Sequence, residues 1–270
     1  MNKKVAIVTG ASSGIGKAFA FDLAKLGYQL VINARSAENL AIVEQELNEQ
    51  YPDTCHAIAG DVALESTSEQ LVNYAKTELG RLDLFIANAG GTMKGLFTEV
   101  QMDVHRKLMD INYFGTLYAA HYALPELMKT HGSFVGVSSV AGFKGLPGRT
   151  GYSASKHAIN GLIDTLQTEF LKLPVHIMLA CPGFTNTNTR KAALLPDGTI
   201  QGDTPREEGK MMSAEDASAQ ILDAMLKKKK RIVLTREGKL ILLLNKLAPE
   251  FLRKKIYQSF ANEPNSPLPK

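Results

Sequence analysis

The stretch Lys4–Gly16 (KVAIVTGASSGIG) decides the fold class of this chain of 270 residues. It begins with an apolar run, which predicts a buried strand, and ends with closely spaced glycines before an amphipathic segment. Gly10 can form the tight turn, Gly14 lets the backbone approach a pyrophosphate, and Gly16 lets the helix pack closely on the sheet. Free N–H groups at the helix start can then bind phosphate, so the stretch predicts a dinucleotide-binding unit.

Short apolar runs alternate with longer amphipathic segments along most of the chain. The predicted strands are Lys4–Thr9, Gln29–Ala34, His56–Ala59, Leu82–Ala87, Ser133–Val137, Val175–Ala180 and Arg231–Leu234. The predicted helices are Ile15–Leu26, Ala37–Gln50, Glu65–Leu79, Val104–Lys129, Ser153–Leu171 and Ala214–Lys227. Continuous apolar strands separated by helices are typical of a parallel sheet covered on both faces. We therefore expect an α/β fold: a doubly wound (Rossmann-type) sheet of about seven parallel strands with helices on both faces.

Composition narrows the class of protein. The apolar fraction of 44% and the charged fraction of 21% are those of a soluble globular chain. Cys55 and Cys181 are too few for a disulfide framework, and no Cys/His cluster suggests a metal. The first apolar run, Val5–Val8, is too short for a signal peptide, and no stretch approaches the ~20 apolar residues of a spanning helix. These features predict a cytoplasmic protein without a metal.

The formal net charge of +4 is unevenly distributed. Residues 227–270 hold 12 Lys/Arg and 3 acids, whereas residues 1–226 hold 19 and 24. No basic groove rich in aromatic residues accompanies this surplus, so we expect no nucleic-acid partner. The basicity belongs to the C-terminal segment and needs its own explanation.

Residues after the second and third strands indicate which dinucleotide binds. Arg35 lies 19 residues after Gly16, where an acid would bind the ribose of NAD. A guanidinium there suits the 2′-phosphate of NADP, and Ser36 could add a hydroxyl; the alternative is a solvated arginine on a loop. Asp61 and Val62 could receive the adenine.

Polar and turn-forming residues follow successive strands and predict one site at one sheet edge. Ser139 closes the fifth strand, and the sequences Asn88–Gly90 and Cys181–Gly183 close the fourth and sixth. Tyr152 and Lys156 are four residues apart on a predicted helix, so their side chains share a face. An ammonium near a phenol is expected to lower its pKa toward the working range of an acid–base catalyst.

Together these residues resemble the short-chain dehydrogenase/reductase family, in its compact one-domain form, over residues 4–235. The matching marks are Thr9–Gly16, Asp61, Asn88, Ala89, Gly90, Asn112, Ser139, Tyr152, Lys156, Pro182, Gly183 and Thr187. Each mark is weak or moderate by itself, but their joint order and spacing are specific. Ser13 departs from the pattern, because many NADP-preferring members have a basic residue there, which leaves the cofactor preference resting on Arg35.

The resemblance implies four catalytic residues. Tyr152 would be the general acid that protonates a carbonyl oxygen, and Lys156 would bind the nicotinamide ribose and lower the pKa of Tyr152. Ser139 would hydrogen-bond the carbonyl oxygen, and Asn112 would hold a water that relays protons toward Lys156. Thr187 and the backbone near Phe184 would contact the nicotinamide carboxamide.

The expected cofactor contacts combine the motif and the resemblance. They are Gly10, Ser12, Ser13, Gly14, Ile15, Gly16, Arg35, Ser36, Asp61, Val62, Asn88, Ala89, Gly90, Tyr152, Lys156, Pro182, Gly183, Phe184, Thr185 and Thr187.

We divide the chain into a dinucleotide-binding and catalytic domain, residues 1–235, and a C-terminal amphipathic extension of it, residues 236–270. The first part includes a polar, poorly periodic segment, residues 184–212, that we interpret as a substrate loop. In the extension, Leu240 to Phe251 carry leucines at helical spacing among lysines, and Pro249 could start a second short helix. Such a segment can pack with a solvated basic face, cover the substrate pocket, contact a partner subunit or lie on a membrane surface.

The leading hypothesis is an NADPH-dependent reductase of a ketone or aldehyde, which in reverse oxidises a secondary alcohol. NADP(H) is the expected cofactor, with NAD(H) as the alternative, and the substrate is expected to be lipophilic. The resemblance favours a homodimer or homotetramer. Two other hypotheses stay open: a non-catalytic dinucleotide-binding sensor or scaffold, and membrane-surface binding through residues 227–255.

Overall fold

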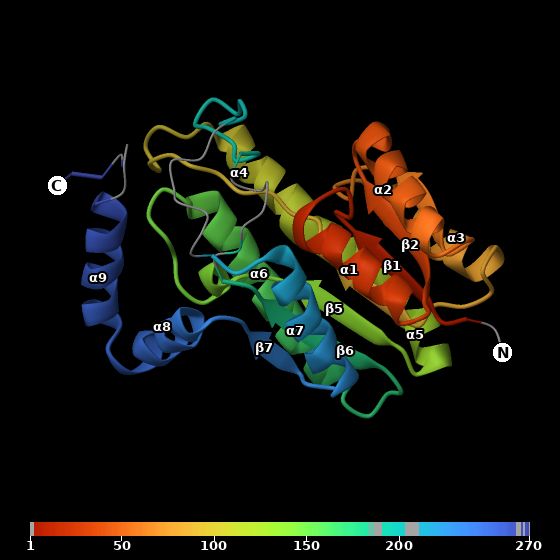
Figure 1. Cartoon of the computed structure of the whole chain (residues 1–270). Helices are drawn as coiled ribbons and strands as arrows, with labels where there is room; N and C mark the ends of the chain where they lie inside the picture. The colour runs from red at the N-terminus through yellow and green to blue at the C-terminus, as the bar shows by residue number, and fades with distance from the viewer. Residues whose placement is uncertain are drawn as a thin grey trace.

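A computed structural model describes residues 3–183, 185, 191–202, 211–262, 266 and 268–269. In these ranges the chain forms one parallel sheet in the order β3-β2-β1-β4-β5-β6-β7 (Figure 1). The strands are β1 (Val5–Thr9), β2 (Gln29–Ala34), β3 (Cys55–Ala59), β4 (Leu84–Ala87), β5 (Ser133–Val137), β6 (His176–Cys181) and β7 (Arg231–Val233). The predicted fold class, a doubly wound parallel sheet, is confirmed.

Helices cover both faces of the sheet. They are α1 (Gly14–Lys25), α2 (Ala37–Gln50), α3 (Glu65–Thr77), α4 (Met102–Leu108), α5 (Gly115–Thr130), α6 (Thr150–Glu169), α7 (Ala214–Leu226), α8 (Arg236–Leu247) and α9 (Pro249–Ala261). A π-helical turn (Met109–Phe114) joins α4 to α5, and a 3₁₀ turn (Val140–Gly142) follows β5. One apolar core packs α1, α2 and α7 on the sheet, and the other packs α3, α5 and α6 on its opposite face.

Alternation along the strands divides the apolar residues between the two cores. In β1, Ala6 and Val8 belong to one core, and Val5 and Ile7 belong to the other. This is the period of two that a strand imposes on its side chains. All of β1 is buried, so the run is continuously apolar rather than alternating.

The order of the strands places the site. The chain leaves β1 toward β2 and β3 on one side, and crosses to β4 on the other side of β1. Ligands of such sheets bind at the carboxyl ends of the strands near this switch point. The site is therefore expected beyond Thr9 and Ala87, where β1 and β4 end.

Two predicted helices differ from the structure. The predicted helix Val104–Lys129 is interrupted by the π-helical turn, in which an extra residue widens the helix locally. Helix α6 begins at Thr150 instead of Ser153, so Tyr152 lies inside its first turn. Pro249 starts a separate helix, α9, as predicted. Across the described ranges, no helix is long and apolar enough to cross a membrane.

Candidate active site

The glycine turn after β1 has the backbone that its sequence predicts. Gly10 and Gly14 have φ angles of +69° and +54°, a region that favours glycine. A Cβ on Gly16 would overlap the carbonyl oxygen of Gly10 and come within 2.7 Å of the Asn88 side-chain nitrogen. The turn therefore brings α1 against the end of β4, with the helix N-terminus facing open space.

A network around Thr9 fixes this edge of the sheet. The Thr9 Oγ1 accepts hydrogen bonds from the backbone N–H groups of Asn88 and Ala89, each at 3.1 Å. The Asn88 amide donates to the Thr9 carbonyl at 2.9 Å. Asn88 thus joins the ends of β1 and β4, and its neighbouring backbone forms one wall of the cavities described next.

A cavity of about 260 Å³ opens beside the glycine turn. Its walls include the predicted cofactor residues Gly10, Ser12, Ser13, Gly14, Ile15, Gly16, Arg35, Asp61, Val62, Asn88, Ala89 and Gly90. Backbone groups that a Cβ would obstruct, together with the free start of α1, fit the phosphates of a dinucleotide. The arrangement therefore suits an extended dinucleotide.

Arg35 lines this cavity, whereas Ser36 does not. Arg35 is exposed, and no acid in the described chain forms an ion pair with it. Ser36 is the N-cap of α2 and accepts a hydrogen bond from the Asn39 N–H at 3.2 Å. The Ser36 hydroxyl is therefore already bonded to the helix and is not among the residues lining the cavity.

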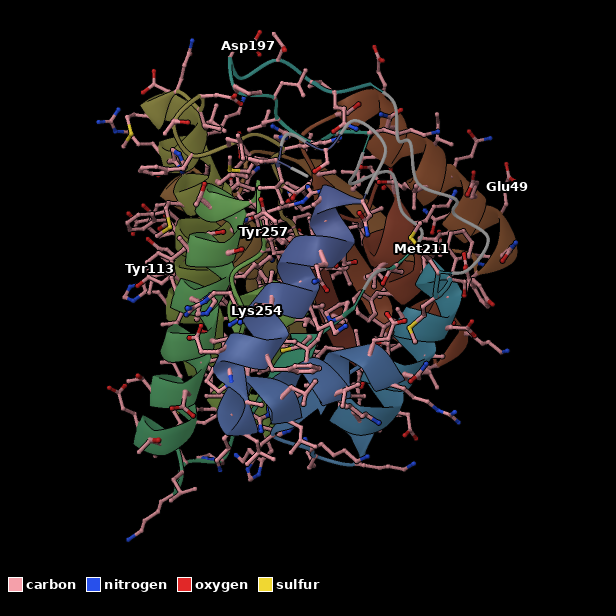
Figure 2. All side chains as sticks on the ribbon, turned by 90° about the vertical axis from the view of Figure 1, so that its left-hand side faces the viewer. Glu49, Tyr113, Asp197, Met211, Lys254 and Tyr257 are labelled. Atoms are coloured by element: carbon pink, nitrogen blue, oxygen red, sulfur yellow. The ribbon has the colours of Figure 1, made fainter. Side chains whose placement is uncertain are left out.

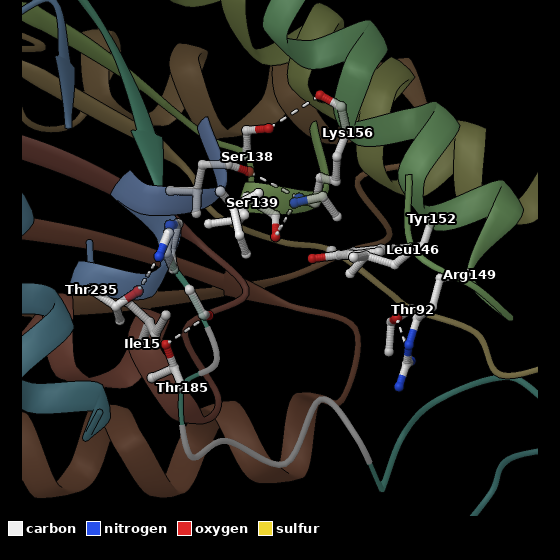
Figure 3. Close-up of a pocket in the computed structure, with 18 of the residues that line it drawn as sticks. Ile15, Thr92, Ser138, Ser139, Leu146, Arg149, Tyr152, Lys156, Thr185 and Thr235 are labelled. Atoms are coloured by element: carbon white, nitrogen blue, oxygen red, sulfur yellow. Dashed lines mark hydrogen bonds between the residues drawn. The ribbon is translucent and has the colours of Figure 1, made fainter. Parts of the chain in front are cut away.

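A second cavity, of about 200 Å³, adjoins the first (Figure 3). Both are lined by Ile15, Asn88, Gly90 and Gly91, so they form one continuous groove. The predicted residues that line the second cavity are Ser139, Tyr152, Lys156, Pro182, Gly183 and Thr185. Phe184 and Thr187, which the sequence also assigned to the cofactor, lie outside the described residues.

Lys156 is buried and directed at the sheet. Its Nζ donates to the Val137 carbonyl at 2.9 Å and lies 5.9 Å from the centre of the Tyr152 ring. Burial lowers the pKa of the Lys156 ammonium to about 8. The ammonium thus remains mostly protonated at neutral pH, with its charge beside the groove.

The surroundings of Tyr152 shift the pKa of its phenol upward. Burial raises the pKa of the Tyr152 phenol above its ordinary value, and the hydrogen bond with Ser139 and the charge of Arg149 only partly oppose this. Lys156 is not among the groups that shift this pKa, and its ammonium donates to the Val137 carbonyl. A lowering of the phenol pKa by Lys156 therefore stays a prediction.

Asn112 lies in the π-helical turn and joins three segments. Its Oδ1 accepts from the Gly91 N–H at 2.7 Å, and its Nδ2 donates to the Gly91 carbonyl at 3.0 Å and to the Ser155 Oγ at 2.8 Å. Ser155 donates to the Tyr152 carbonyl at 2.8 Å. The fully buried amide therefore holds the end of β4 against the helix that carries Tyr152. The predicted water on Asn112 stays a prediction.

Ser139 projects from the end of β5. Its Oγ caps the following 3₁₀ turn by accepting from the Ala141 N–H at 3.2 Å. The adjacent Ser138, which is not one of the predicted site residues, donates to the Lys156 carbonyl at 3.1 Å. This bond joins the end of β5 to α6, and Ser139 and Tyr152 line the same cavity.

Sequence reasoning missed several walls of the second cavity. Thr92, Leu146, Arg149, Thr235, Glu237, Gly238 and Ile241 also line it. Arg149 donates to the Thr92 hydroxyl and the Met93 carbonyl, which fixes the loop after β4. The leucine spacing had shown a helix after residue 235, but only the structure shows that one side of α8 adjoins the groove.

Comparisons with known proteins agree with this geometry. Residues 4–196 match the family described as short chain dehydrogenase. The Mus musculus protein called dehydrogenase/reductase SDR family member 7B is 31% identical over 239 residues, which make up 87% of this chain and 74% of that protein.

Two solved structures share the fold over most of their length. A short-chain dehydrogenase from Streptomyces avermitilis has a TM-score of 0.81 and 28% identity, covering 96% of this chain and 98% of that one. An alcohol dehydrogenase from the archaeon Thermococcus sibiricus, complexed with 5-hydroxy-NADP, has a TM-score of 0.75 and 25% identity, covering 86% and 96%. With the sequence match and the shared sheet, these likenesses establish that the chain belongs to the short-chain dehydrogenase/reductase family of oxidoreductases.

Proposed function

We propose that the protein is an NADPH-dependent reductase of ketones or aldehydes, which in reverse oxidises secondary alcohols. The observation that carries the proposal is the continuous groove that runs from the glycine turn to Tyr152, Lys156 and Ser139. The nicotinamide, when bound, supplies the hydride. The remaining chemistry falls to side chains of the chain itself.

Tyr152 donates its phenolic proton to the carbonyl oxygen as charge develops there. The raised pKa of Tyr152 keeps the phenol protonated at neutral pH, as a general acid for reduction requires. Ser139 donates a hydrogen bond to the same oxygen and stabilises its charge. Lys156 would bind the ribose hydroxyls of the cofactor, and its ammonium, 5.9 Å from the centre of the Tyr152 ring, favours the phenolate left after proton transfer. Asn112 holds a water that returns protons toward Lys156.

Arg35 supports the preference for NADP(H) over NAD(H). Its exposed guanidinium lines the end of the cofactor cavity, where it can pair with a 2′-phosphate. We expect Arg35→Asp to weaken NADPH binding by about tenfold to hundredfold, because a charge-assisted pair is lost and a repulsion added. Arg81→Asp is an unsuitable control because Arg81 pairs with the buried Asp83. Arg106 pairs with the exposed Asp103 instead, so Arg106→Asp serves as the control. A variant at position 35 that still prefers NADPH would contradict the assignment.

Apolar walls support a lipophilic substrate. Val140, Leu146 and Ile241 face the second cavity with few charged neighbours. We further propose residues 1–235 as the dinucleotide-binding and catalytic domain, and residues 236–270 as its extension. Family resemblance supports a homodimer or homotetramer, and the two free cysteines support a cytoplasmic location.

The decisive experiment is Tyr152→Phe. We expect a loss of about 10²–10⁴-fold in turnover with NADPH and a panel of ketones, because the general acid is removed. Cofactor binding, measured by fluorescence, should change little. Tyr51→Phe, remote from the groove, is the control and should behave like the wild type. Unchanged turnover in Tyr152→Phe would refute the mechanism.

The alternative is a dinucleotide-binding sensor or scaffold without turnover. It predicts NADPH binding but no NADPH oxidation across steroid, quinone, sugar and acyl ketones. The convergence of Ser139, Tyr152 and Lys156 on one cavity favours the enzyme.

A further inference from the structure

An apolar stripe runs along the outer side of the C-terminal helices. Leu240, Leu243 and Leu247 on α8 are 53%, 54% and 69% exposed, and Phe251 on α9 is 54% exposed. Spacings of three and four residues put the three leucines on one side of α8. In the described part of the chain, no element covers this stripe.

The inner side of α8 belongs to the active site. Gly238 is buried beneath Val140, where a Cβ would come within 2.9 Å of the valine side chain, and Ile241 lines the second cavity. Asn245 donates to the Phe143 carbonyl at 3.0 Å. A single helix thus separates the substrate cavity from the apolar stripe.

Exposed cations lie on the same two helices as the stripe. Helices α8 and α9 carry six exposed cations, against two carboxylates, Glu237 and Glu250; the cations are Arg236, Lys239, Lys246, Arg253, Lys254 and Lys255. Glu250 pairs with Arg253. Figure 2 shows α8 and α9 lying across one face of the molecule, with Lys254 and Tyr257 labelled on α9. Apolar side chains rimmed by ammonium groups are typical of a helix that lies in a membrane interface.

Charge decides between a bilayer and a second copy of the chain. A two-fold interface through this stripe would bring two surfaces of net positive charge together, which opposes association. Anionic headgroups instead attract each lysine and arginine near the surface. We propose that the outer side of α8 and α9 binds an anionic phospholipid surface, with the leucines entering the headgroup boundary, so that lipid-dissolved ketones reach the cavity behind α8. The surface does not depend on the proposed reductase function, although the route of the substrate does.

The test is cosedimentation of the full chain with vesicles. Wild type should bind vesicles of equimolar phosphatidylcholine and phosphatidylserine, and bind pure phosphatidylcholine much less. Leu243→Glu/Leu247→Glu should weaken binding to the anionic vesicles by about tenfold or more, since two apolar contacts become repulsive. The matched control is Leu26→Glu/Leu171→Glu, which changes two leucines of similar exposure on other elements by the same charge and should bind like the wild type.

Three outcomes would overturn the proposal: no binding of wild type to anionic vesicles, equal binding by both double variants, or loss of binding in the control as well. Light scattering adds a second readout. If Leu243→Glu/Leu247→Glu changes the oligomeric state and the wild type does not bind anionic vesicles, the stripe is an interface between copies of the chain, and the proposal is wrong. Circular dichroism of each variant verifies folding, and vesicle binding is measured whether or not the protein reduces any ketone.

Discussion

Replacing glycine by alanine is expected to have opposite effects on stability at two helical positions, Gly16 and Gly161. In α1, a Cβ on Gly16 would overlap the Gly10 carbonyl and approach the Asn88 side chain at 2.7 Å. Neither neighbour can move away easily, because the Asn88 side chain is hydrogen-bonded to the Thr9 carbonyl and Gly10 forms the tight turn. Overpacking against fixed groups costs about 1–3 kcal/mol, and the clash with backbone puts this site at the upper end. The gain of alanine over glycine in a helix, about 0.5–1 kcal/mol, offsets part of it. We expect Gly16→Ala to lower the free energy of unfolding by about 2 kcal/mol.

Gly161 in α6 is the matched control. It is exposed, and a Cβ there would meet nothing within 4 Å, so Gly161→Ala should raise the free energy of unfolding by about 0.5–1 kcal/mol. Urea unfolding followed by circular dichroism measures both changes. Fluorescence titration with NADPH should also show weaker binding in Gly16→Ala alone, since the start of α1 is displaced. Equal stability and equal NADPH affinity of Gly16→Ala and wild type would refute the close-packing argument.

Two further predictions concern buried polar groups. Because burial lowers the pKa of Lys156 from 10.5 to about 8, its charge costs the folded state about 3 kcal/mol below pH 8, and this cost fades as the pH rises to 10.5. Lys156→Met should therefore be more stable than wild type at pH 7, by this amount minus the contribution of the lost hydrogen bond to Val137. Urea unfolding should show that the difference in stability becomes smaller by pH 10. A difference that does not depend on pH would contradict the prediction. Ser218 donates to the Asp22 carboxylate at 2.6 Å between α7 and α1, so Ser218→Ala should cost about 1.5–3 kcal/mol in thermal unfolding, whereas the exposed Ser66→Ala should not.

Much of the fold could be predicted because burial leaves a periodic record in the sequence. The predicted bounds of β2, α2 and β5 coincide with those observed. The strand alternation that divides β1 between two cores needs only apolar residues, which the pattern shows directly. The π-helical turn could not be predicted, since one extra residue in a helix alters hydrogen bonding without changing composition.

The sequence predicts where the candidate site lies, but not how its side chains are directed. Parallel strands bring their carboxyl ends together, so the sequence alone places Asn88 and Ser139 at one edge of the sheet. The direction of the Lys156 ammonium could not be predicted, because it depends on the Val137 carbonyl, a backbone group with no sequence signal. The sequence also could not predict which part of α8 lines the cavity. Helical spacing shows that a helix has an apolar side, but it does not show which part of the protein that side contacts.

The π-helical turn also has a consequence for engineering. A design procedure that favours regular helices would remove one residue between Met109 and Phe114, and the resulting continuous helix would gain regular backbone hydrogen bonds. The same deletion would rotate Asn112 by about 100° around the helix axis, away from Gly91 and Ser155. Helix idealisation would therefore leave a buried amide without its partners and would separate β4 from α6 at the groove. A stabilised design of this protein should therefore keep the π-helical turn Met109–Phe114.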